Sequence, residues 1–300
     1  MVTDEKYKLK LKKQIAFLIF ALIILSFTSC DSKKISNISY DSSTGKFQCR
    51  YDNKQHQFIL CLSEKTKDSP LVFMLHGAGQ NSIFFRNETD FEKTACPNGY
   101  GVVYVDSTYD TGWIYSDSRE SESELNFLDA LAKYLQEKYG FSTSMTYAAG
   151  FSSGAFMCTK LAVCKPKTFS AVVSVGGMMP ENIWNIRKTN VSPQCGFFQI
   201  NGTKDPVVPM DFLKTSRDNP NPSIEKTIEY FSGKKNSANQ IHSTKLSDKS
   251  TLFKYSQKVW WLVIEDETHR WPKSSWSGVD TNEIILEYFE QLNKKNVPEI

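Results

Sequence analysis

Residues 145–163 decide the fold of this chain, and they read MTYAAGFSSGAFMCTKLAV. The first five residues form a largely apolar run, which suits a strand buried on both faces, and residues 155–163 have a helix-like composition. Between the two lies the pattern Gly150-Phe151-Ser152-Ser153-Gly154. A strand-to-helix turn of this type lifts the serine oxygen above the sheet and excludes large side chains from the glycine positions. Ser152 is therefore a candidate nucleophile, and the alternative is a glycine-rich turn with a spectator serine.

Strand-like and helix-like segments alternate along the rest of the chain. Helical periodicity extends from Ser121 to Tyr139, where Ser121 and Glu124 have the spacing of a capping box. A second helix is predicted after Asp280, with Glu283 three residues on. Strands alternating with helices predict the α/β class, with a mostly parallel central sheet and helices on both faces. Five further runs of the type expected for buried strands lie at residues 71–75, 101–105, 171–175, 196–200 and 259–264.

An N-terminal antiparallel hairpin is predicted before this alternating region. Its two segments are Phe47–Tyr51 and Gln57–Leu62, and Asp52-Asn53-Lys54 separates them. No internal repeat or glycine- or proline-rich linker divides the rest of the sequence. Since a chain of 300 residues can bury one sizeable core, we expect a single domain over residues 47–296.

The N-terminal residues have the features of a targeting segment. Lysines precede the apolar run Ile15 to Leu25, which is short for a bilayer span, so residues 1–29 are predicted to be a signal peptide. The ending Phe27-Thr28-Ser29-Cys30 is similar to a bacterial lipobox, in which the cysteine after the cleavage site carries lipid. We expect Cys30 to be lipidated and residues 31–46, which are polar and serine-rich, to form a flexible tether. An ordinary signal peptide or an uncleaved anchor is the alternative.

Each of these interpretations places the rest of the chain outside the cytoplasm, either secreted or lipid-anchored at the extracellular face of a bacterial membrane. The net charge of +3 does not point to another kind of partner. Five lysines and two acidic residues of the predicted signal peptide account for all of it, which leaves 31 basic and 31 acidic residues. Because nucleic-acid binding depends on a basic face, we expect no nucleic-acid partner.

Six cysteines remain once Cys30 is assigned to lipid. An even number in an exported protein permits disulfides, and we expect Cys49 to pair with Cys61 and Cys164 with Cys195. None of the cysteines has the C-x-x-C spacing of a zinc or redox site, so we expect no metal. The six are Cys49, Cys61, Cys96, Cys158, Cys164 and Cys195.

A nucleophilic serine needs a base to accept its proton, and histidine suits that exchange near neutral pH. His269 follows the run at residues 259–264 and precedes the last helix, so it is the predicted base. A carboxylate must orient the imidazole, and Asp205, just after the run at residues 196–200, is the predicted acid. Asp211 and Asp266 are competitors for this role. The other histidines, which have less suitable positions, are His56, His76 and His242.

The turn after the first buried strand reads Leu75-His76-Gly77-Ala78-Gly79-Gln80. Acyl transfer needs donors for a developing oxyanion, and we assign these donors to the backbone N–H groups of Ala78 and Ser153. A dinucleotide-binding loop is the alternative for this turn, but it requires a third glycine where Ser82 stands. We therefore expect no cofactor.

In these motifs the chain resembles the secreted α/β-hydrolase esterases related to polyhydroxybutyrate depolymerases, feruloyl esterases and acetylxylan esterases. The resemblance implies an α/β-hydrolase fold and a catalytic triad of Ser152, Asp205 and His269. It also implies hydrolysis of feruloyl, acetyl or short hydroxyalkanoate esters, either small or linked to polysaccharides. The matching segments are residues 70–77, 112–113, 150–154, 201–209 and 269–272.

One feature departs from these relatives, which usually have glycines before the catalytic histidine. Here Glu265, Asp266 and Glu267 precede it. We expect this acidity to disfavour anionic substrates, unless the loop is solvated and its charge is screened.

The substrate itself is less well defined by the sequence. Trp113 and Trp271 fall in loops at the expected ligand-binding edge, where they either stack an aromatic acyl group or a sugar, or simply pack. Two other function classes stay open: a catalytically silent surface lipoprotein that uses the fold for binding, and a peptidase or thioesterase with the same triad. The oligomeric state is not predicted.

Overall fold

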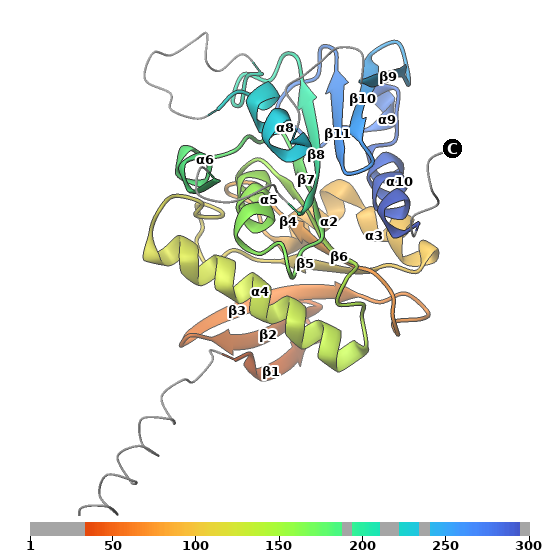
Figure 1. The fold of residues 1–300 in the computed structure, drawn as a ribbon. Helices are drawn as coiled ribbons and strands as arrows, with labels where there is room; N and C mark the ends of the chain where they lie inside the picture. The colour runs from red at the N-terminus through yellow and green to blue at the C-terminus, as the bar shows by residue number, and fades with distance from the viewer. Residues whose placement is uncertain (1–33, 188–193, 211–221, 234–240, 295–300) are drawn as a thin grey trace, which may run out of the picture. The chain divides into compact units, whose positions relative to one another are not determined.

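A mixed β-sheet lies at the centre of the unit formed by residues 35–300 (Figure 1). The computed structural model describes residues 34–187, 194–210, 222–233 and 241–294. The predicted signal peptide and Cys30 lie outside the described residues. In the described ranges, no helix has both the length and the apolar character needed to cross a bilayer.

The order of the strands identifies the architecture. Six neighbouring strands at the centre are parallel, and antiparallel strands extend the sheet at both ends. The predicted mostly parallel sheet with an N-terminal hairpin is therefore confirmed. Within the described residues the spatial order is β1 (Ser36–Asp41), β2 (Lys46–Tyr51), β3 (Lys54–Cys61), β5 (Gly101–Val105), β4 (Leu71–Leu75), β6 (Thr146–Phe151), β7 (Ala171–Val175), β8 (Gly196–Gly202), β11 (Val259–Ile264), β10 (Ser250–Ser256) and β9 (His242–Lys245).

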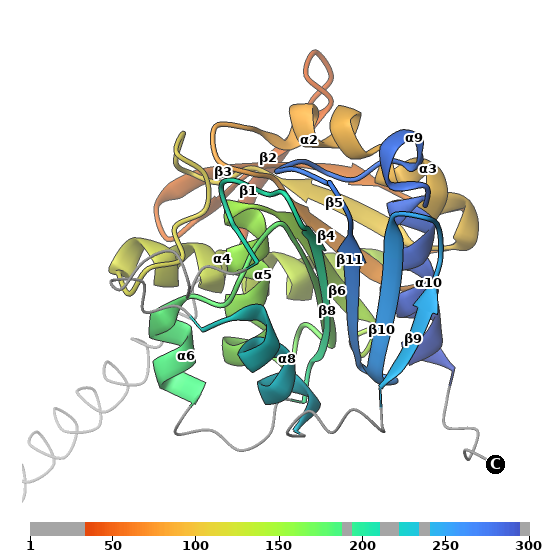
Figure 2. The same ribbon diagram turned by 90° about the horizontal axis from the view of Figure 1, so that it is seen from above.

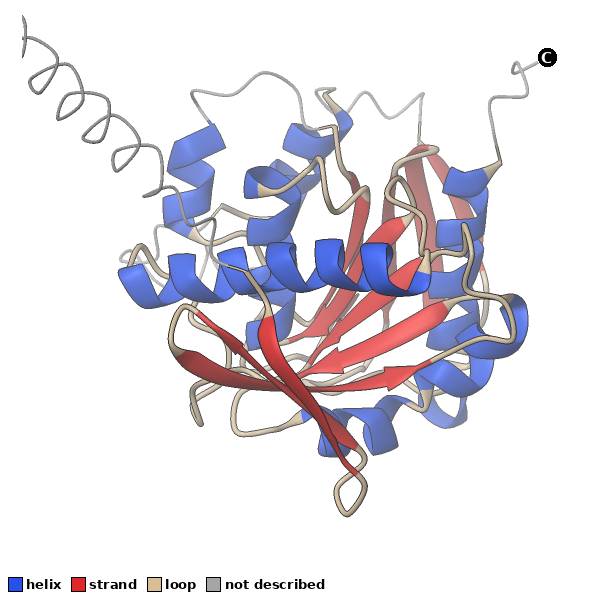
Figure 3. Ribbon diagram, turned by 90° about the horizontal axis from the view of Figure 1, so that it is seen from below, coloured by secondary structure: helices blue, strands red, loops and turns tan. Residues whose placement is uncertain are grey.

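Helices cover both faces of the sheet, as Figures 2 and 3 show. One face carries α4 (Arg119–Tyr139), α5 (Ser153–Cys164), α6 (Glu181–Arg187) and α8 (Ile224–Ser232). The other carries α2 (Ser82–Thr89), α3 (Phe91–Ala95) and α10 (Thr281–Asn293). The short helices η1 (Cys96–Asn98) and α9 (Ser274–Ser277) complete the described set.

The two faces explain why the central strands lack polar alternation. Phe73 of β4 packs in the cluster that contains Leu128 of α4, whereas the next residue, Met74, packs with Phe85 of α2 and Phe289 of α10. Each residue of such a strand therefore enters one of two cores, and each large apolar side chain contributes about 1.5–3 kcal/mol on burial.

The cap of α10 follows the prediction, but that of α4 does not. Asp280 accepts hydrogen bonds from the backbone N–H groups of Asn282 and Glu283. In α4 the N-cap is Ser118, whose hydroxyl accepts from the N–H of Ser121, so the predicted cap at Ser121 is wrong. The helix extends one turn further toward its N-terminus because Ser121 and Glu124 are buried and their side chains bond to tertiary partners instead.

The chain also contains strands that the sequence analysis missed. Residues 36–41 form β1, which pairs antiparallel with β2, so a flexible tether over residues 31–46 is wrong for this segment. At the other end of the sheet, β9 and β10 pair antiparallel, and the sequence analysis predicted neither strand. Both β1 and β9 are largely exposed, and such strands depend on backbone pairing with a neighbour that local sequence does not reveal.

The two predicted disulfides are wrong, since all six described cysteines are free. Cys49 of β2 lies in the core on the α4 side of the sheet, whereas Cys61 of β3 packs against the core on the other side. The sheet separates them, which prevents pairing. Cys195 is buried and its thiol donates to the carbonyl oxygen of Phe169 at 3.2 Å, while Cys164 ends α5 in a half-buried position.

Candidate active site

Ser152 occupies the strained turn that its motif requires. Its φ is +52° and its ψ is −118°, between the end of β6 and the start of α5. A Cβ at Gly150 would collide with the backbone of Gly154, and a Cβ at Gly154 would collide with the carbonyl group of Leu75. Glycine at both positions therefore allows the turn to close, and the positive φ holds the serine in a conformation that side chains rarely adopt.

Three side chains that are far apart in the sequence meet at this turn. The Ser152 hydroxyl lies 2.9 Å from His269 Nε2, and His269 Nδ1 lies 2.7 Å from Asp205 Oδ2. With the Nδ1 proton donated to the carboxylate, Nε2 is the acceptor for the serine proton. The structure thus brings together the three residues that were predicted to form a triad.

Asp205 is held by its own loop. Its second oxygen, Oδ1, accepts hydrogen bonds of 2.8 Å from the backbone N–H groups of Val207 and Val208. The side chain of Asp205 is 1% exposed, whereas that of His269 is 15% exposed. The carboxylate is therefore fixed and shielded, and the imidazole keeps access to the surface.

The loops that carry Asp205 and His269 follow β8 and β11, which are neighbouring parallel strands. The backbone N–H of Lys204 donates to the carbonyl of Glu267 at 3.0 Å, and a Cβ at Gly202 would collide with that same residue. This contact aligns the acid with the base. Of the competitors, Asp266 is exposed and paired with Lys204, and Asp211 lies outside the described residues.

The acidic residues before His269 are largely compensated by cations. Asp266 pairs with Lys204 at 2.6 Å, and the buried Glu267 pairs with Arg270 at 2.5 Å. Glu265 accepts from the hydroxyl of Thr203. The pairing reduces the local negative charge, which weakens the expectation that this loop disfavours anionic substrates.

The two residues that carry the predicted oxyanion donors, Ala78 and Ser153, lie on either side of Gly112. Gly112, with a φ of +93°, fills the space between them: a Cβ there would lie 2.8 Å from Ala78 Cα and 2.7 Å from Ser153 Oγ. The turn that carries Ala78 is braced by Gly77, whose N–H donates to Gln80 Oε1 at 2.8 Å. The backbone of Ala78 and the side chain of Ser153, the residue after Ser152, therefore both lie against Gly112.

Glu124 holds the Gly112 loop in place, a role that the sequence analysis missed. Its carboxylate, buried beneath the loop, accepts hydrogen bonds from the Ser107 hydroxyl at 2.7 Å, the Thr108 N–H at 3.1 Å and the Ile114 N–H at 2.9 Å. Burial raises the pKa of Glu124, although these hydrogen bonds oppose the shift. One feature of the sequence could have indicated this role: Glu124 lies one helical turn before Leu128, on the buried face of α4.

The two tryptophans predicted as stacking platforms are packed instead. Trp113 is 3% exposed and lies 5.6 Å from the His76 ring. Trp271 is 2% exposed, meets Phe85 edge-on, and donates its indole N–H to Asn282. The packing alternative therefore holds for both.

An apolar cluster lies on the α5 side of Ser152. Tyr115 stacks on Phe156 with ring centroids 4.5 Å apart, and Met178 and Val208 complete the cluster. Phe156 follows Ser152 by one helical turn, and Val208 belongs to the Asp205 loop. These positions give the site an apolar wall that the sequence analysis did not identify.

The sequence model of a family described as phospholipase/carboxylesterase matches residues 55–248. Among curated proteins, the "Putative esterase NocK" of Nocardia uniformis subsp. tsuyamanensis is 28% identical over 177 residues, which cover 54% of this chain and 50% of that protein. Feruloyl esterase B of Talaromyces stipitatus is 29% identical over 113 residues, or 36% of this chain and 32% of that protein. The aligned segments thus span half or less of the length of these relatives.

Solved structures share the fold. An acetyl xylan esterase from Aspergillus awamori superposes with a TM-score of 0.63 at 15% identity, covering 79% of this chain and 94% of that one.

Proposed function

Because the chain belongs to the phospholipase/carboxylesterase family, we propose that it is a serine hydrolase of carboxylic esters that works through an acyl-enzyme. The observation that carries this proposal is the continuous hydrogen-bonded path from Ser152 Oγ through the His269 ring to Asp205. A binding module has no need for nucleophile, base and acid in line.

The first half of the proposed reaction forms the acyl-enzyme. Ser152 Oγ attacks the ester carbonyl carbon while His269 Nε2 accepts the hydroxyl proton. The negative charge that develops on the carbonyl oxygen is stabilised by the N–H groups of Ala78 and Ser153. The carbon–oxygen bond to the alcohol then breaks, and Nε2 returns its proton to the departing alcohol oxygen.

The second half releases the acid. Water attacks the acyl carbon, His269 Nε2 accepts one of its protons, and the bond to Ser152 Oγ breaks as that oxygen regains the proton. Asp205 keeps the Nδ1 tautomer throughout and stabilises the imidazolium that forms in each half. Its two backbone hydrogen bonds keep it in position for this role. None of these steps calls for a cofactor.

We propose feruloyl, acetyl or short hydroxyalkanoate esters as substrates, either small or linked to polysaccharides. The partial match to a feruloyl esterase supports this choice. So does the apolar wall of Tyr115 and Phe156, which suits a small apolar or aromatic acyl group.

We also propose that the protein is exported and anchored by lipid at Cys30, at the extracellular face of a bacterial membrane. The lysine-rich, apolar N-terminus and the lipobox-like residues 27–30 support this. Metabolic labelling with a radioactive fatty acid should mark the wild type and not Cys30→Ala, and labelling of both would contradict the proposal.

A substrate panel tests the enzymatic proposal. We expect p-nitrophenyl acetate, p-nitrophenyl butyrate or methyl ferulate to be hydrolysed by the wild type, with a loss of at least about 10³-fold in Ser152→Ala. Ser275→Ala is the matched control, because Ser275 is an exposed serine of α9, and it should retain full activity. Ester hydrolysis that survives Ser152→Ala would refute the mechanism. Preference for a peptide anilide or a thioester would reassign the substrate.

A further inference from the structure

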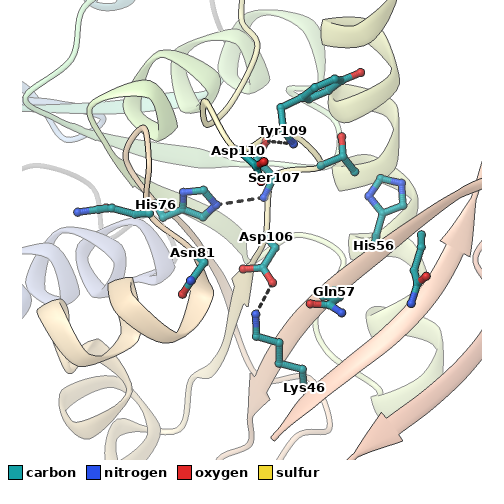
Figure 4. Close-up of a pocket in the computed structure, with 12 residues that line it drawn as sticks. Lys46, His56, Gln57, His76, Asn81, Asp106, Ser107, Tyr109 and Asp110 are labelled. Atoms are coloured by element: carbon teal, nitrogen blue, oxygen red, sulfur yellow. Dashed lines mark hydrogen bonds and ion pairs between the residues drawn. The ribbon is translucent and has the colours of Figure 1, made fainter. Parts of the chain in front are cut away.

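His76 lies in the turn after β4, directly before Gly77 and Ala78, and is 2% exposed. Its ring contacts the segment after β5, where the backbone N–H of Ser107 donates to His76 Nε2 at 3.1 Å (Figure 4). On the other edge of the ring, His76 Nδ1 lies 2.8 Å from the carbonyl oxygen of Gly77. None of the proposed reaction steps uses this buried imidazole.

These two contacts fix the position of the imidazole proton. A backbone N–H can only donate, so Nε2, which faces Ser107, is an acceptor. A carbonyl oxygen can only accept, so Nδ1, which faces Gly77, carries the proton. Burial lowers the pKa of His76 and so favours the neutral ring, which has a single N–H. His76 therefore donates from Nδ1 to Gly77 and accepts at Nε2 from Ser107.

The carbonyl oxygen of Gly77 and the N–H of Ala78 belong to the same peptide group. Because this peptide is trans, its C=O and N–H bonds point in opposite directions. A hydrogen bond that holds the Gly77 carbonyl toward His76 therefore holds the Ala78 N–H facing away from the ring. The accepted hydrogen bond also polarises the peptide group, which makes its N–H a stronger donor.

The Ala78 N–H is available to a ligand. In the same turn, the Gly77 N–H donates to Gln80 Oε1 at 2.8 Å, and the Gln80 N–H donates to the Gly77 carbonyl at 3.3 Å. The Ala78 N–H has no acceptor among the described residues, and Ala78 is exposed. Of the two hydrogen bonds to the Gly77 carbonyl, the one from His76 is the shorter. The imidazole is thus the stronger restraint on a peptide whose N–H can still bind an oxyanion.

The imidazole is in turn held by the neighbouring loop. Ser107, which donates to Nε2, is anchored through its hydroxyl to Glu124 at 2.7 Å. Trp113 packs beside the His76 ring, with ring centroids 5.6 Å apart. Both His76 and Ser107 also line a polar cavity of about 390 Å³ at the carboxyl end of β5. Because this cavity leaves room on one side, hydrogen bonds and not packing alone set the orientation of the ring.

We propose that His76 is a positioning residue for the oxyanion donor: its Nδ1–H holds the Gly77 carbonyl and thereby orients the Ala78 N–H toward the carbonyl oxygen of the ester. This role rests on the proposed ester hydrolysis and on Ala78 as one of its donors. Through Ser107, it joins His76 to the network that Glu124 anchors. The observations that carry it are the fixed tautomer, the shared peptide group and the uncommitted N–H.

Two substitutions separate the two hydrogen bonds of His76. Asparagine places its amide nitrogen near the position of Nδ1, so His76→Asn keeps the donor to Gly77. Glutamine places its amide oxygen near the position of Nε2 instead, so His76→Gln keeps the acceptor for Ser107 and loses the donor. With p-nitrophenyl acetate as substrate, kcat should fall at least about 10-fold in His76→Gln and less than about threefold in His76→Asn. KM should change less than about twofold in either variant.

His56→Gln is the matched control, because His56 is also buried but lies on β3. It should keep the wild-type kcat. Near-ultraviolet circular dichroism shows whether each variant is folded. A wild-type kcat in His76→Gln, an equal loss in the two His76 variants, or a change confined to KM would overturn the proposal.

Nitrogen NMR tests the tautomer in the wild type, so it decides the question even if neither His76 variant folds. Long-range ¹H–¹⁵N spectra distinguish Nδ1–H from Nε2–H imidazoles, and single substitutions of the other three histidines assign the signals. We expect the Nδ1–H form for His76 near neutral pH, whereas free histidine prefers the Nε2–H form. An Nε2–H or a protonated His76 would overturn the proposal. If the wild type hydrolyses no ester, the proposed function fails, and the spectrum still shows whether His76 holds the Gly77 carbonyl.

Discussion

Glu124, on the buried face of α4, accepts a 2.9 Å hydrogen bond from the backbone N–H of Ile114, two residues after Gly112. The same carboxylate also accepts a hydrogen bond from the hydroxyl of Ser107, which precedes that glycine in the loop. One buried side chain therefore holds both ends of the loop that packs between Ala78 and Ser153.

Replacing Glu124 should affect both stability and rate. Glu124→Ala leaves several buried donors unpaired, so we expect a loss of about 2–4 kcal/mol in unfolding free energy and of about 10–100-fold in kcat. Denaturant unfolding and p-nitrophenyl acetate kinetics check this. Glu137→Ala changes an exposed glutamate of the same helix and should alter neither. Wild-type kcat in folded Glu124→Ala would rule out the positioning role.

Gly112→Ala should impair the oxyanion site more than the fold. The new Cβ would press on Ala78 and Ser153, and we expect kcat to fall about 10²-fold with little change in KM. Gly99→Ala is the matched control, because Gly99 also has a positive φ but has nothing within 4 Å of the added Cβ. It should cost only about 1 kcal/mol of stability. Similar kinetics for the two variants would contradict the placement of the oxyanion donors.

Asp205→Asn should lower kcat about 10³–10⁴-fold, because an amide cannot hold the imidazole in the required tautomer or stabilise its charged form. Asp266→Asn changes the competing acid, which is exposed, and should retain most activity. Steady-state kinetics on one ester compare the two variants directly. If Asp266→Asn proved the more damaging, the acid would have been misassigned.

Protonation of His56 should destabilise the fold at acidic pH. Since burial lowers its pKa from 6.5 to about 4, the unfolded chain binds the proton more tightly than the folded chain does. Stability from this group is therefore lost as pH falls from about 6.5 toward 4, by up to about 3 kcal/mol. The unfolding free energy should therefore depend less on pH across this range in His56→Phe than in the wild type. It should keep its pH dependence in His242→Phe, since His242 is exposed on β9. An unchanged slope in His56→Phe would refute this assignment.

Local patterns were sufficient to predict the central strands, the cap of α10 and the candidate nucleophile. Met145–Val163 contains both the buried strand and the two glycines that its turn needs, so neighbouring residues alone specify the geometry around Ser152. The chain order of β8 and β11 likewise predicts where Asp205 and His269 emerge, because parallel strands end at one edge of the sheet.

Other features depend on partners that are distant in the sequence. The neighbouring sequence does not show whether Glu124 caps α4 or holds the Gly112 loop in place. Nor does it show whether Trp271 stacks on a substrate or packs on Phe85. Strand β1 exists through its pairing with β2, and the two faces of the sheet keep Cys49 and Cys61 apart.

The sequence by itself therefore determined the fold class and the candidate nucleophile, because periodicity and turn composition act over short stretches of chain. Only the tertiary structure decided which side chains support the site, which tryptophans are buried and where the polar cavity opens. Those outcomes depend on packing and hydrogen bonding between segments that are far apart in the sequence, such as Trp271 against Phe85.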